Sequence, residues 1–466
     1  MAKAKIQYSC TECGAVSQKW SGKCNDCNSW NTIEEVIGSS GYSKAKPSEK
    51  GKIIDFFSLE GKADNAARFN TNIDELNRVL GGGLVKGSAV LIGGDPGIGK
   101  STILLQVMAK IADSGLNAAY ITGEESIDQI RLRAKRLNVT NSPIKLASAT
   151  NVSDIIATLN KEKPDVVVID SIQTMFINSI ESAPGTVSQV RMSAYELINM
   201  AKQNNIAIIL VGHVTKEGQI AGPKVLEHMV DTTLYFEGDR GHQFRILRSV
   251  KNRYGAANEI GVFEMTGNGL SEVTNPSSLF ISGTAGKVSG SVVFPGIEGS
   301  RTVMVEIQAL VSPSTMPTPR RAVVGWDSNR LAMILAVLQT RCGVKIADKE
   351  VYLNVAGGIK ISEPAADVAV AAALISALSN VPFAADSVVF GELGLSGEIR
   401  PVSQFNNRLK EAEKLGFTSA IMPKQEKKNN KLDKNQNNDN FSGSQDFIIK
   451  EIQYISQLKE FLAIEE

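Results

Sequence analysis

An excess of charge of either sign is missing from this sequence. Its 466 residues include 50 Lys and Arg against 49 Asp and Glu, which leaves a net charge of +1. The overall charge therefore gives no reason to expect attraction to nucleic-acid phosphates. Any binding of DNA has to depend on local groups of positive charge.

Long hydrophobic runs are also missing. No stretch approaches the roughly 18 to 20 apolar residues that span a bilayer, and the first seven residues lack the hydrophobic core of a secretory signal. The sequence therefore predicts a cytoplasmic protein without a membrane partner. In such a reducing compartment, closely paired cysteines favour metal binding over disulfides.

Four of the five cysteines form two close pairs near the N-terminus, Cys10 with Cys13 and Cys24 with Cys27. Four thiolates at this spacing suit a closed, tetrahedral zinc site. Because four protein ligands leave no open position for water, we expect the zinc to be structural rather than catalytic. Cysteines that share a small core by chance are the alternative.

Length and composition predict several folded domains. At about 100 to 200 residues per domain the chain has room for two to four, and 42% hydrophobic with 21% charged residues is typical of a folded protein. Between residues 69 and 274, apolar runs alternate with longer helical segments, which predicts a largely parallel sheet flanked by helices. The expected strands are 89–92, 118–121, 166–169, 206–211 and 232–236.

After residue 274 the pattern is α+β. We expect strands at 303–310 and 388–390 and an Ala-rich helix at 365–378. Residues 424–445 are dense in Asn, Lys, Asp and Gln, which predicts a disordered surface insertion.

A phosphate-binding loop follows the expected strand at 89–92. The pattern Gly-x-x-x-x-Gly-Lys-Ser is complete, and its glycines let the backbone turn so that N–H groups face phosphates. Lys100 is expected to reach the β- and γ-phosphates of ATP, and Ser101 to bind Mg²⁺, while the start of the next helix adds favourable partial charge. The predicted nucleotide-binding residues of this loop are Gly94, Asp95, Pro96, Gly97, Ile98, Gly99, Lys100, Ser101 and Thr102.

Acidic residues after two other strands would complete this site. Asp170 ends an apolar strand and can hold the Mg²⁺ through water, although an acid in this position can also simply begin a loop. Glu124 and Glu125 follow the strand at 118–121, where a carboxylate can polarise the attacking water. We prefer Glu124 as this base and regard Glu125 as a solvated or capping residue.

The order of these motifs resembles the RadA family of bacterial, RecA-related recombination and repair proteins. The resemblance rests on the four-cysteine module, Leu80-Gly-Gly-Gly-Leu84, Lys251-Asn-Arg-Tyr-Gly255 and the C-terminal domain. It implies an α/β fold in three parts. These are a C4 zinc finger at 1–37, a RecA-like P-loop ATPase core at 56–274 and an α+β Lon-protease-like domain at 275–466. A linker at 38–55 joins the first part to the second.

The resemblance also implies a homo-oligomer, a hexameric ring that binds nucleotide between subunits. Lys251 and Arg253 would reach the neighbour's site and stabilise the transferred phosphate as an arginine finger does; a solvated strand edge is the alternative for this basic stretch. His213 stands where RecA-like proteins keep a glutamine that senses the γ-phosphate, although an isolated His is usually only a strand-end residue. Segments 175–190 and 215–224 correspond to loops that line the DNA channel.

The C-terminal domain resembles the proteolytic domain of Lon, most clearly at 391–402. The protease needs a serine nucleophile and a lysine base. Ala365 falls at the serine position and Asn406 at the lysine position, with Lys410 nearby. The missing serine argues against peptidase activity, and we expect a scaffold that forms the ring and can add a DNA-binding surface.

Taken with the family, the sequence implies a DNA-dependent ATPase motor that uses ATP, Mg²⁺ and Zn²⁺. It would act on single-stranded and branched DNA alongside the RecA recombinase, extending heteroduplex or migrating branches during recombination and repair. Two alternatives stay open. One is an ATP-dependent Lon-like protease, and the other is a nucleotide-switched scaffold ATPase that does not translocate.

Overall fold

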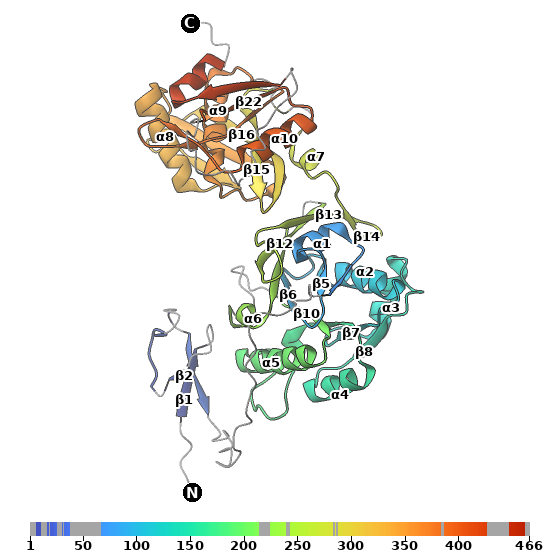
Figure 1. The fold of residues 1–466 in the computed structure, drawn as a ribbon. Helices are drawn as coiled ribbons and strands as arrows, with labels where there is room; N and C mark the ends of the chain where they lie inside the picture. Colours follow the sequence, from blue (N-terminus) through green and yellow to red (C-terminus); the bar gives the residue numbers. More distant parts are fainter. Residues whose placement is uncertain are drawn as a thin grey trace, which may run out of the picture. The chain divides into compact units, whose positions relative to one another are not determined.

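The computed structural model forms two compact units, Met1–Glu272 and Val273–Glu466, each described by itself (Figure 1). The predicted linker at 38–55 lies outside the described residues, as does the predicted insertion from residue 426 onward. The described residues are 6–10, 16–17, 19–25, 30, 32–37, 67–213, 224–238, 243–282, 285, 288–383, 386–425 and 447–461.

The N-terminal module is a small antiparallel sheet. Strand β1 (Ile6–Cys10) pairs with β2 (Val16–Ser17) on one side and β3 (Ile33–Ile37) on the other. Two of the predicted zinc ligands, Cys10 and Cys24, are buried in one cluster with Ile33. Such a short sheet has too little apolar surface to be stable alone, which agrees with the predicted structural zinc site.

A nine-stranded sheet forms the centre of the first unit, in the order β14-β13-β12-β11-β6-β10-β9-β7-β8. The six strands from β11 to β8 are parallel. The five predicted strands are confirmed, with ends that differ by at most two residues. Their bounds are β6 Ala89–Gly94, β7 Ala118–Thr122, β9 Val166–Asp170, β10 Ala207–Val211 and β11 Thr232–Glu237, with β8 Lys145–Ser148 at the edge.

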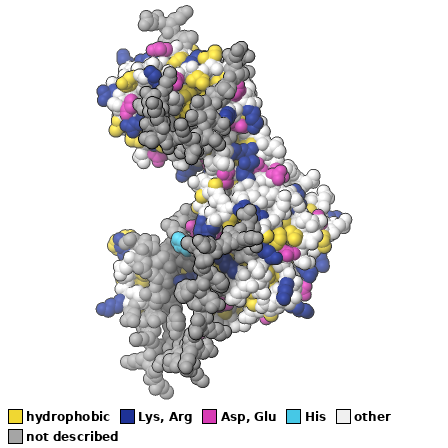
Figure 2. All heavy atoms as spheres, viewed as in Figure 1, with side chains coloured by type: hydrophobic (Ala, Val, Ile, Leu, Met, Phe, Trp, Pro, Cys, Tyr) yellow, Lys and Arg dark blue, Asp and Glu magenta, His cyan; other side chains and the backbone are white. Residues whose placement is uncertain are grey.

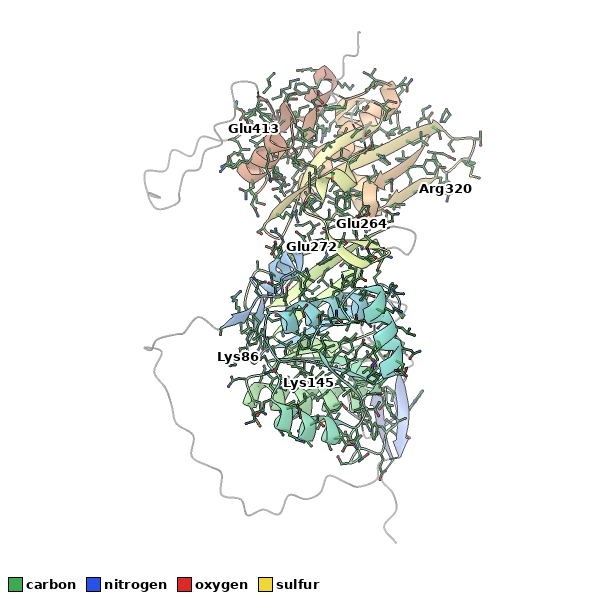
Figure 3. All side chains as sticks on the ribbon, turned by 90° about the vertical axis from the view of Figure 1, so that its right-hand side faces the viewer. Lys86, Lys145, Glu264, Glu272, Arg320 and Glu413 are labelled. Atoms are coloured by element: carbon green, nitrogen blue, oxygen red, sulfur yellow. The ribbon has the colours of Figure 1, made fainter. Side chains whose placement is uncertain are left out.

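Three further strands extend the sheet on its other side as an antiparallel meander, which we did not predict. They are β12 (Phe244–Asn252), β13 (Ile260–Thr266) and β14 (Gly269–Glu272). Glu272, labelled in Figure 3, accepts a hydrogen bond from the backbone N–H of Glu75 and so ties β14 to helix α1 (Asp74–Leu80).

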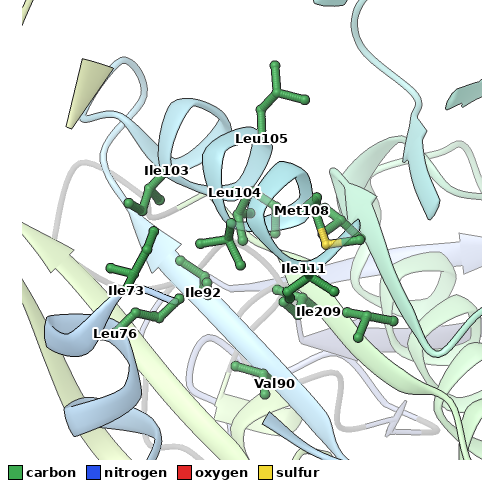
Figure 4. Packing of buried hydrophobic residues seen from close by; sticks show 14 of the residues in the cluster. Ile73, Leu76, Val90, Ile92, Ile103, Leu104, Leu105, Met108, Ile111 and Ile209 are labelled. Atoms are coloured by element: carbon green, nitrogen blue, oxygen red, sulfur yellow. The ribbon is translucent and has the colours of Figure 1, made fainter. Parts of the chain in front are cut away.

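Helices cover both faces of this sheet. One apolar cluster joins α1, α2 (Lys100–Asp113) and α3 (Ile127–Arg136) to one face, and a second joins α4 (Val152–Glu162), α5 (Val187–Gln203) and α6 (Lys224–Met229) to the other. Figure 4 shows Leu104, Met108 and Ile111 of α2 packed over Ile92 and Ile209. The helical spacing of these apolar residues therefore fixes α2 against β6, directly behind the phosphate loop.

The second unit has a seven-stranded mixed sheet in the order β17-β18-β16-β15-β19-β22-β23. Its central helix α9 (Asp367–Ser379) starts two residues later than predicted, because Pro364–Ala366 form a 3-10 turn. The other main elements are β15 Ser291–Glu298, β16 Arg301–Pro313, β17 Arg321–Val324, α8 Ser328–Cys342, β18 Lys349–Val355, β19 Ser387–Val389, α10 Phe405–Lys414, β22 Ser419–Pro423 and β23 Ile448–Ile452.

The described surface carries both signs of charge. Figure 2 shows Lys and Arg side chains intermingled with Asp and Glu on the visible face, as expected for a net charge of +1. Among the described residues, no helix is long and apolar enough to cross a membrane.

Candidate active site

The phosphate loop connects β6 to α2, and its glycines are required by its shape. Gly94 has φ of 151° and Gly99 has φ of 119°, values that side-chain-bearing residues rarely adopt. A Cβ at Gly94 would also lie 2.8 Å from Phe236. Ile98 is buried beneath the loop and anchors it, whereas Asp95 is exposed.

Lys100 is a buried cation held by weak partners. Its side chain is 4% exposed and its Nζ donates to the carbonyls of Gly94 (2.6 Å) and Asp95 (2.9 Å) in its own loop. Burial lowers the pKa of Lys100, an effect that the charges of Asp170 and Glu124 oppose. Because a charged phosphate is a stronger acceptor than a neutral carbonyl, this ammonium suits a phosphate ligand.

Asp170 ends β9 beside the loop. Its carboxylate is buried, and its Oδ2 accepts a hydrogen bond from the hydroxyl of Tyr120 in β7. Burial, followed by the charge of Asp170, raises the pKa of Tyr120 well above its usual value. The side chain of Ser101, in the first turn of α2, is close enough to that hydroxyl to oppose the rise in the pKa of Tyr120. The oxygens of Asp170 and Ser101 are the type of ligand that Mg²⁺ prefers, so this pair fits the metal.

Glu124 lies between two hydrogen-bond donors. Its Oε1 accepts from the hydroxyl of Ser171 and lies 2.8 Å from Nε2 of His213. The hydrogen bond from His213 is the largest influence and lowers the pKa of Glu124, against the effect of burial and with help from Ser171. The carboxylate is therefore ionised at neutral pH, as a residue that orients water should be.

Glu125, the alternative base, points to a different partner. It forms an ion pair with Arg133 of α3, with 2.5 Å between Oε1 and Nη2. Burial alone would lower the pKa of Arg133, but the hydrogen bond and charge of Glu125 raise it. This pairing ties the residue before the N-cap of α3 to the last turn of that helix and favours Glu124 for contact with water.

Arg253 is fixed at the opposite end of the sheet from the phosphate loop. Its Nη1 lies 3.2 Å from Oδ1 of Asp231, a buried acid that also pairs with Lys202 (3.1 Å) and accepts from the backbone N–H of Ala89. Ala89 begins β6, and Gly94 ends it. At about 3.3 Å per residue, Arg253 is therefore roughly 16 Å along the strand from its own phosphate loop.

Lys251 lies at the same edge as Arg253. Its Nζ donates to the carbonyls of Glu227 (2.6 Å) and Val230 (2.8 Å) at the end of α6. Burial lowers the pKa of Lys251, and the charge of Arg253 adds to this. Neither basic residue reaches the nucleotide site of its own chain, which fits the predicted action on a neighbour. The predicted alternative of a solvated edge fits Lys251 poorly, because its ammonium group donates to two backbone carbonyls.

The stretch 251–255 packs against the glycine run at 81–83. A Cβ at Gly255 would lie 2.7 Å from the Cα of Gly81, and one at Gly81 would lie 2.9 Å from the Cα of Gly255. Asn252 donates to the carbonyl of Val79 (3.2 Å), and Arg68 donates to the carbonyl of Tyr254 (2.8 Å). The two sequence motifs thus form one rigid corner that sets where Arg253 lies.

The zinc ligands are only partly within the described residues. Cys10 and Cys24 lie in one buried cluster, and the thiol of Cys10 is 3.2 Å from the hydroxyl of Thr32. Cys13 and Cys27 lie outside the described residues, as does most of the predicted DNA loop at 215–224. The other predicted loop, 175–190, is shorter than expected because α5 begins at Val187.

An internal ion pair stands in the part of the second unit that resembles a protease. Ala365 is buried and carries no nucleophile, and the preceding Glu363 pairs with the fully buried Arg408 of α10. Arg408 lies in the same helix as Asn406, which the resemblance places at the position of the base, and as Lys410, which is exposed.

Several residues that shape these sites carry only a weak signal in the sequence or none at all. They are Tyr120, Ser171 and Asp231. A polar-tipped aromatic in an otherwise aliphatic strand was a signal for Tyr120, and Ser171 directly follows Asp170. Nothing in the sequence pairs Asp231 with Arg253, because their contact depends on how β12 folds back along β11.

Three family models match parts of the chain. A model described as an AAA domain matches residues 58–219, a rubredoxin metal binding domain matches residues 8–35, and subunit ChlI of Mg-chelatase matches residues 320–426. The first spans the phosphate loop and Asp170, so the chain is an ATP hydrolase that uses ATP and Mg²⁺. The second spans all four paired cysteines, so the module is a zinc ribbon, and the third falls in the Lon-like unit.

Whole-chain relatives agree with these matches. The sequence is 58% identical to the DNA repair protein RadA of Rickettsia felis over 428 residues, which covers 91% of this chain and 95% of the relative. It is 56% identical to RadA of Brucella abortus over 432 residues (91% and 92%) and 53% identical to RadA of Pseudomonas aeruginosa over 425 residues (91% and 94%). The chain therefore belongs to the RadA family.

Proposed function

We propose that this chain is a DNA-dependent ATPase motor of DNA recombination and repair. It acts on single-stranded and branched DNA and, alongside the RecA recombinase, extends heteroduplex by branch migration. The relatives named as DNA repair proteins support the process, and the phosphate loop supports the energy source. The main structural support for a motor is that the phosphate loop lies at one end of the sheet, whereas Lys251 and Arg253 lie at the other end.

In this proposal, one subunit binds and orients the nucleotide. Lys100 moves from its loop carbonyls to the β- and γ-phosphates. Ser101 and Asp170 would hold the Mg²⁺, which would neutralise charge on the phosphates. His213 contacts the γ-phosphate as a sensor while it borders Glu124. Among the described residues, Oε2 of Glu124 accepts no hydrogen bond, so this oxygen is available to orient the attacking water.

The neighbouring subunit completes the site. Lys251 and Arg253 reach across the interface and stabilise the charge that develops on the transferred phosphate. A site shared between subunits couples hydrolysis to movement of one subunit against the next, which a closed hexameric ring around DNA can convert into translocation. The loop between Met175 and α5 lines the channel, and the Lon-like unit serves as the ring's scaffold.

Stimulation by single-stranded DNA tests this function. We expect ATP hydrolysis to rise with added oligonucleotide and to be lost in Lys100→Ala with or without DNA. A rate that does not depend on DNA would contradict the motor and favour a nucleotide-switched scaffold.

Two observations argue against the protease alternative. Ala365 has no hydroxyl to act as a nucleophile, and the nearby Glu363 forms an ion pair with Arg408. Digestion of casein that depends on ATP, in a preparation free of contaminating proteases, would contradict this conclusion.

A further inference from the structure

Tyr120 lies beneath the nucleotide site although it is not part of the phosphate loop. It is 1% exposed and belongs to the apolar cluster between the sheet, α2 and α3. Strand β7 pairs with β9, with Thr122 opposite Asp170, so the phenol of Tyr120 runs along the sheet toward the acid. Its hydroxyl donates to Oδ2 of Asp170, and the side chain of Ser101 is near enough to influence the pKa of this phenol.

We propose that Tyr120 is a positioning residue for the magnesium ion, holding Asp170 in the orientation that the metal requires. This inference rests on the proposed function only in assigning Asp170 to Mg²⁺. Among the described residues, Oδ1 of Asp170 accepts no hydrogen bond, so the contact from Tyr120 leaves that oxygen for a metal-bound water. Residues that orient metal ligands in this way commonly change metal affinity when they are removed.

The position of Lys100 supports a role beyond packing. Lys100 and Asp170 are both buried in the same site, yet Lys100 donates to Gly94 and Asp95 and no ion pair joins it to Asp170 among the described residues. A buried carboxylate with no other partner would be drawn toward the nearest cation. The hydrogen bond from Tyr120 gives the acid a partner other than Lys100, so the acid and the lysine can each meet a separate ligand.

Replacing Tyr120 by Phe tests this directly, because it removes the hydroxyl and keeps the ring. The matched control is Tyr235→Phe, since Tyr235 lies in the same sheet and donates to a different carboxylate, Glu227 (2.6 Å). Mn²⁺ affinity of the ADP-bound protein is measured by electron paramagnetic resonance without DNA, together with ADP affinity in EDTA and the melting temperature. We expect Tyr120→Phe to weaken Mn²⁺ binding about tenfold or more with ADP affinity in EDTA unchanged, and Tyr235→Phe to leave both unchanged.

Unchanged Mn²⁺ affinity in a folded Tyr120→Phe variant would overturn the proposal, even if its melting temperature falls, because the hydroxyl would then be only structural. If this variant does not fold, 3-fluorotyrosine at position 120 keeps the hydroxyl but alters its strength as a donor. A Mn²⁺ affinity unaffected by that substitution would also overturn it. A wild-type protein whose ADP complex binds no Mn²⁺ would instead contradict the assignment of the site itself.

Discussion

Lys100 in the ATPase domain and Arg408 in the Lon-like unit are both buried cations, but their partners differ. Arg408 is 0% exposed and is fully engaged within its own unit. It pairs with Glu363, donates to the carbonyls of Pro295 (2.5 Å) and Ser403 (3.2 Å), and lies over the rings of Phe294 and Phe390. Lys100, by contrast, donates to just two partners within the described part of the chain, the neutral carbonyls of Gly94 and Asp95 in its own loop.

The different partners of these two cations distinguish a structural charge, Arg408, from a functional one, Lys100. A buried cation with a carboxylate partner and satisfied donors has nothing to offer a ligand, and its removal leaves the partner uncompensated. A buried cation held by weak acceptors gains when a phosphate arrives. By this criterion the first unit has a cation available to a ligand, whereas in the second unit the Arg408–Glu363 ion pair fixes α10 to the segment before Ala365.

The largest expected effect is the loss of hydrolysis in Lys100→Ala. We expect turnover to fall by about 10²–10³-fold or more, because the charge that would stabilise the transferred phosphate is lost. Folding should be little affected, since only two backbone carbonyls lose a donor. Steady-state ATPase assays measure the loss of turnover, and thermal melts measure the effect on folding. A variant that unfolds would show that Lys100 is structural, like Arg408.

Arg408→Ala should, in contrast, chiefly reduce stability. Removing one partner of a buried pair leaves Glu363 uncompensated, so we expect the free energy of unfolding of the Lon-like unit to fall by about 3–5 kcal/mol. Chemical denaturation measures this loss. The double variant Glu363→Gln, Arg408→Met is the control and should lose less, since no unpaired charge remains. Equal losses in the two variants would contradict the ion-pair account.

A smaller effect is expected at His213. Its hydrogen bond lowers the pKa of Glu124. In His213→Ala that pKa rises, so the carboxylate is protonated at a higher pH and the acid limb of the ATPase pH profile moves upward. His213→Gln keeps a donor and should shift the limb less. An acid limb at the same pH in all three proteins would show that Glu124 is not the group that titrates.

The sequence could predict the parts of the site that depend on local pattern. Lys100, Ser101 and Asp170 follow from the phosphate loop and the strand ends, since parallel strands bring their carboxyl ends to one edge. The meander β12–β14 does not follow from a local pattern, because buried and exposed positions do not alternate regularly along β12 and β13. The Tyr120–Asp170 and Arg408–Glu363 contacts join residues far apart in sequence, so no local pattern reveals them.

The corner formed by Gly81 and Gly255 shows the same limit. Both motifs were visible in the sequence, but nothing there shows that their backbones touch. Their contact explains why two separated glycines are needed: each must lack a Cβ for the other to fit. It also explains how Arg253 is held at the edge of the domain.

The central claim is that the two ends of this sheet serve different subunits, and mixing two inactive variants tests it most directly. Lys100→Ala keeps the basic edge, and Arg253→Ala keeps the phosphate loop. We predict that an equal mixture recovers DNA-stimulated ATP hydrolysis, because roughly a quarter of randomly assembled interfaces join an intact loop to an intact Arg253. A mixture no more active than its separate components would contradict the account.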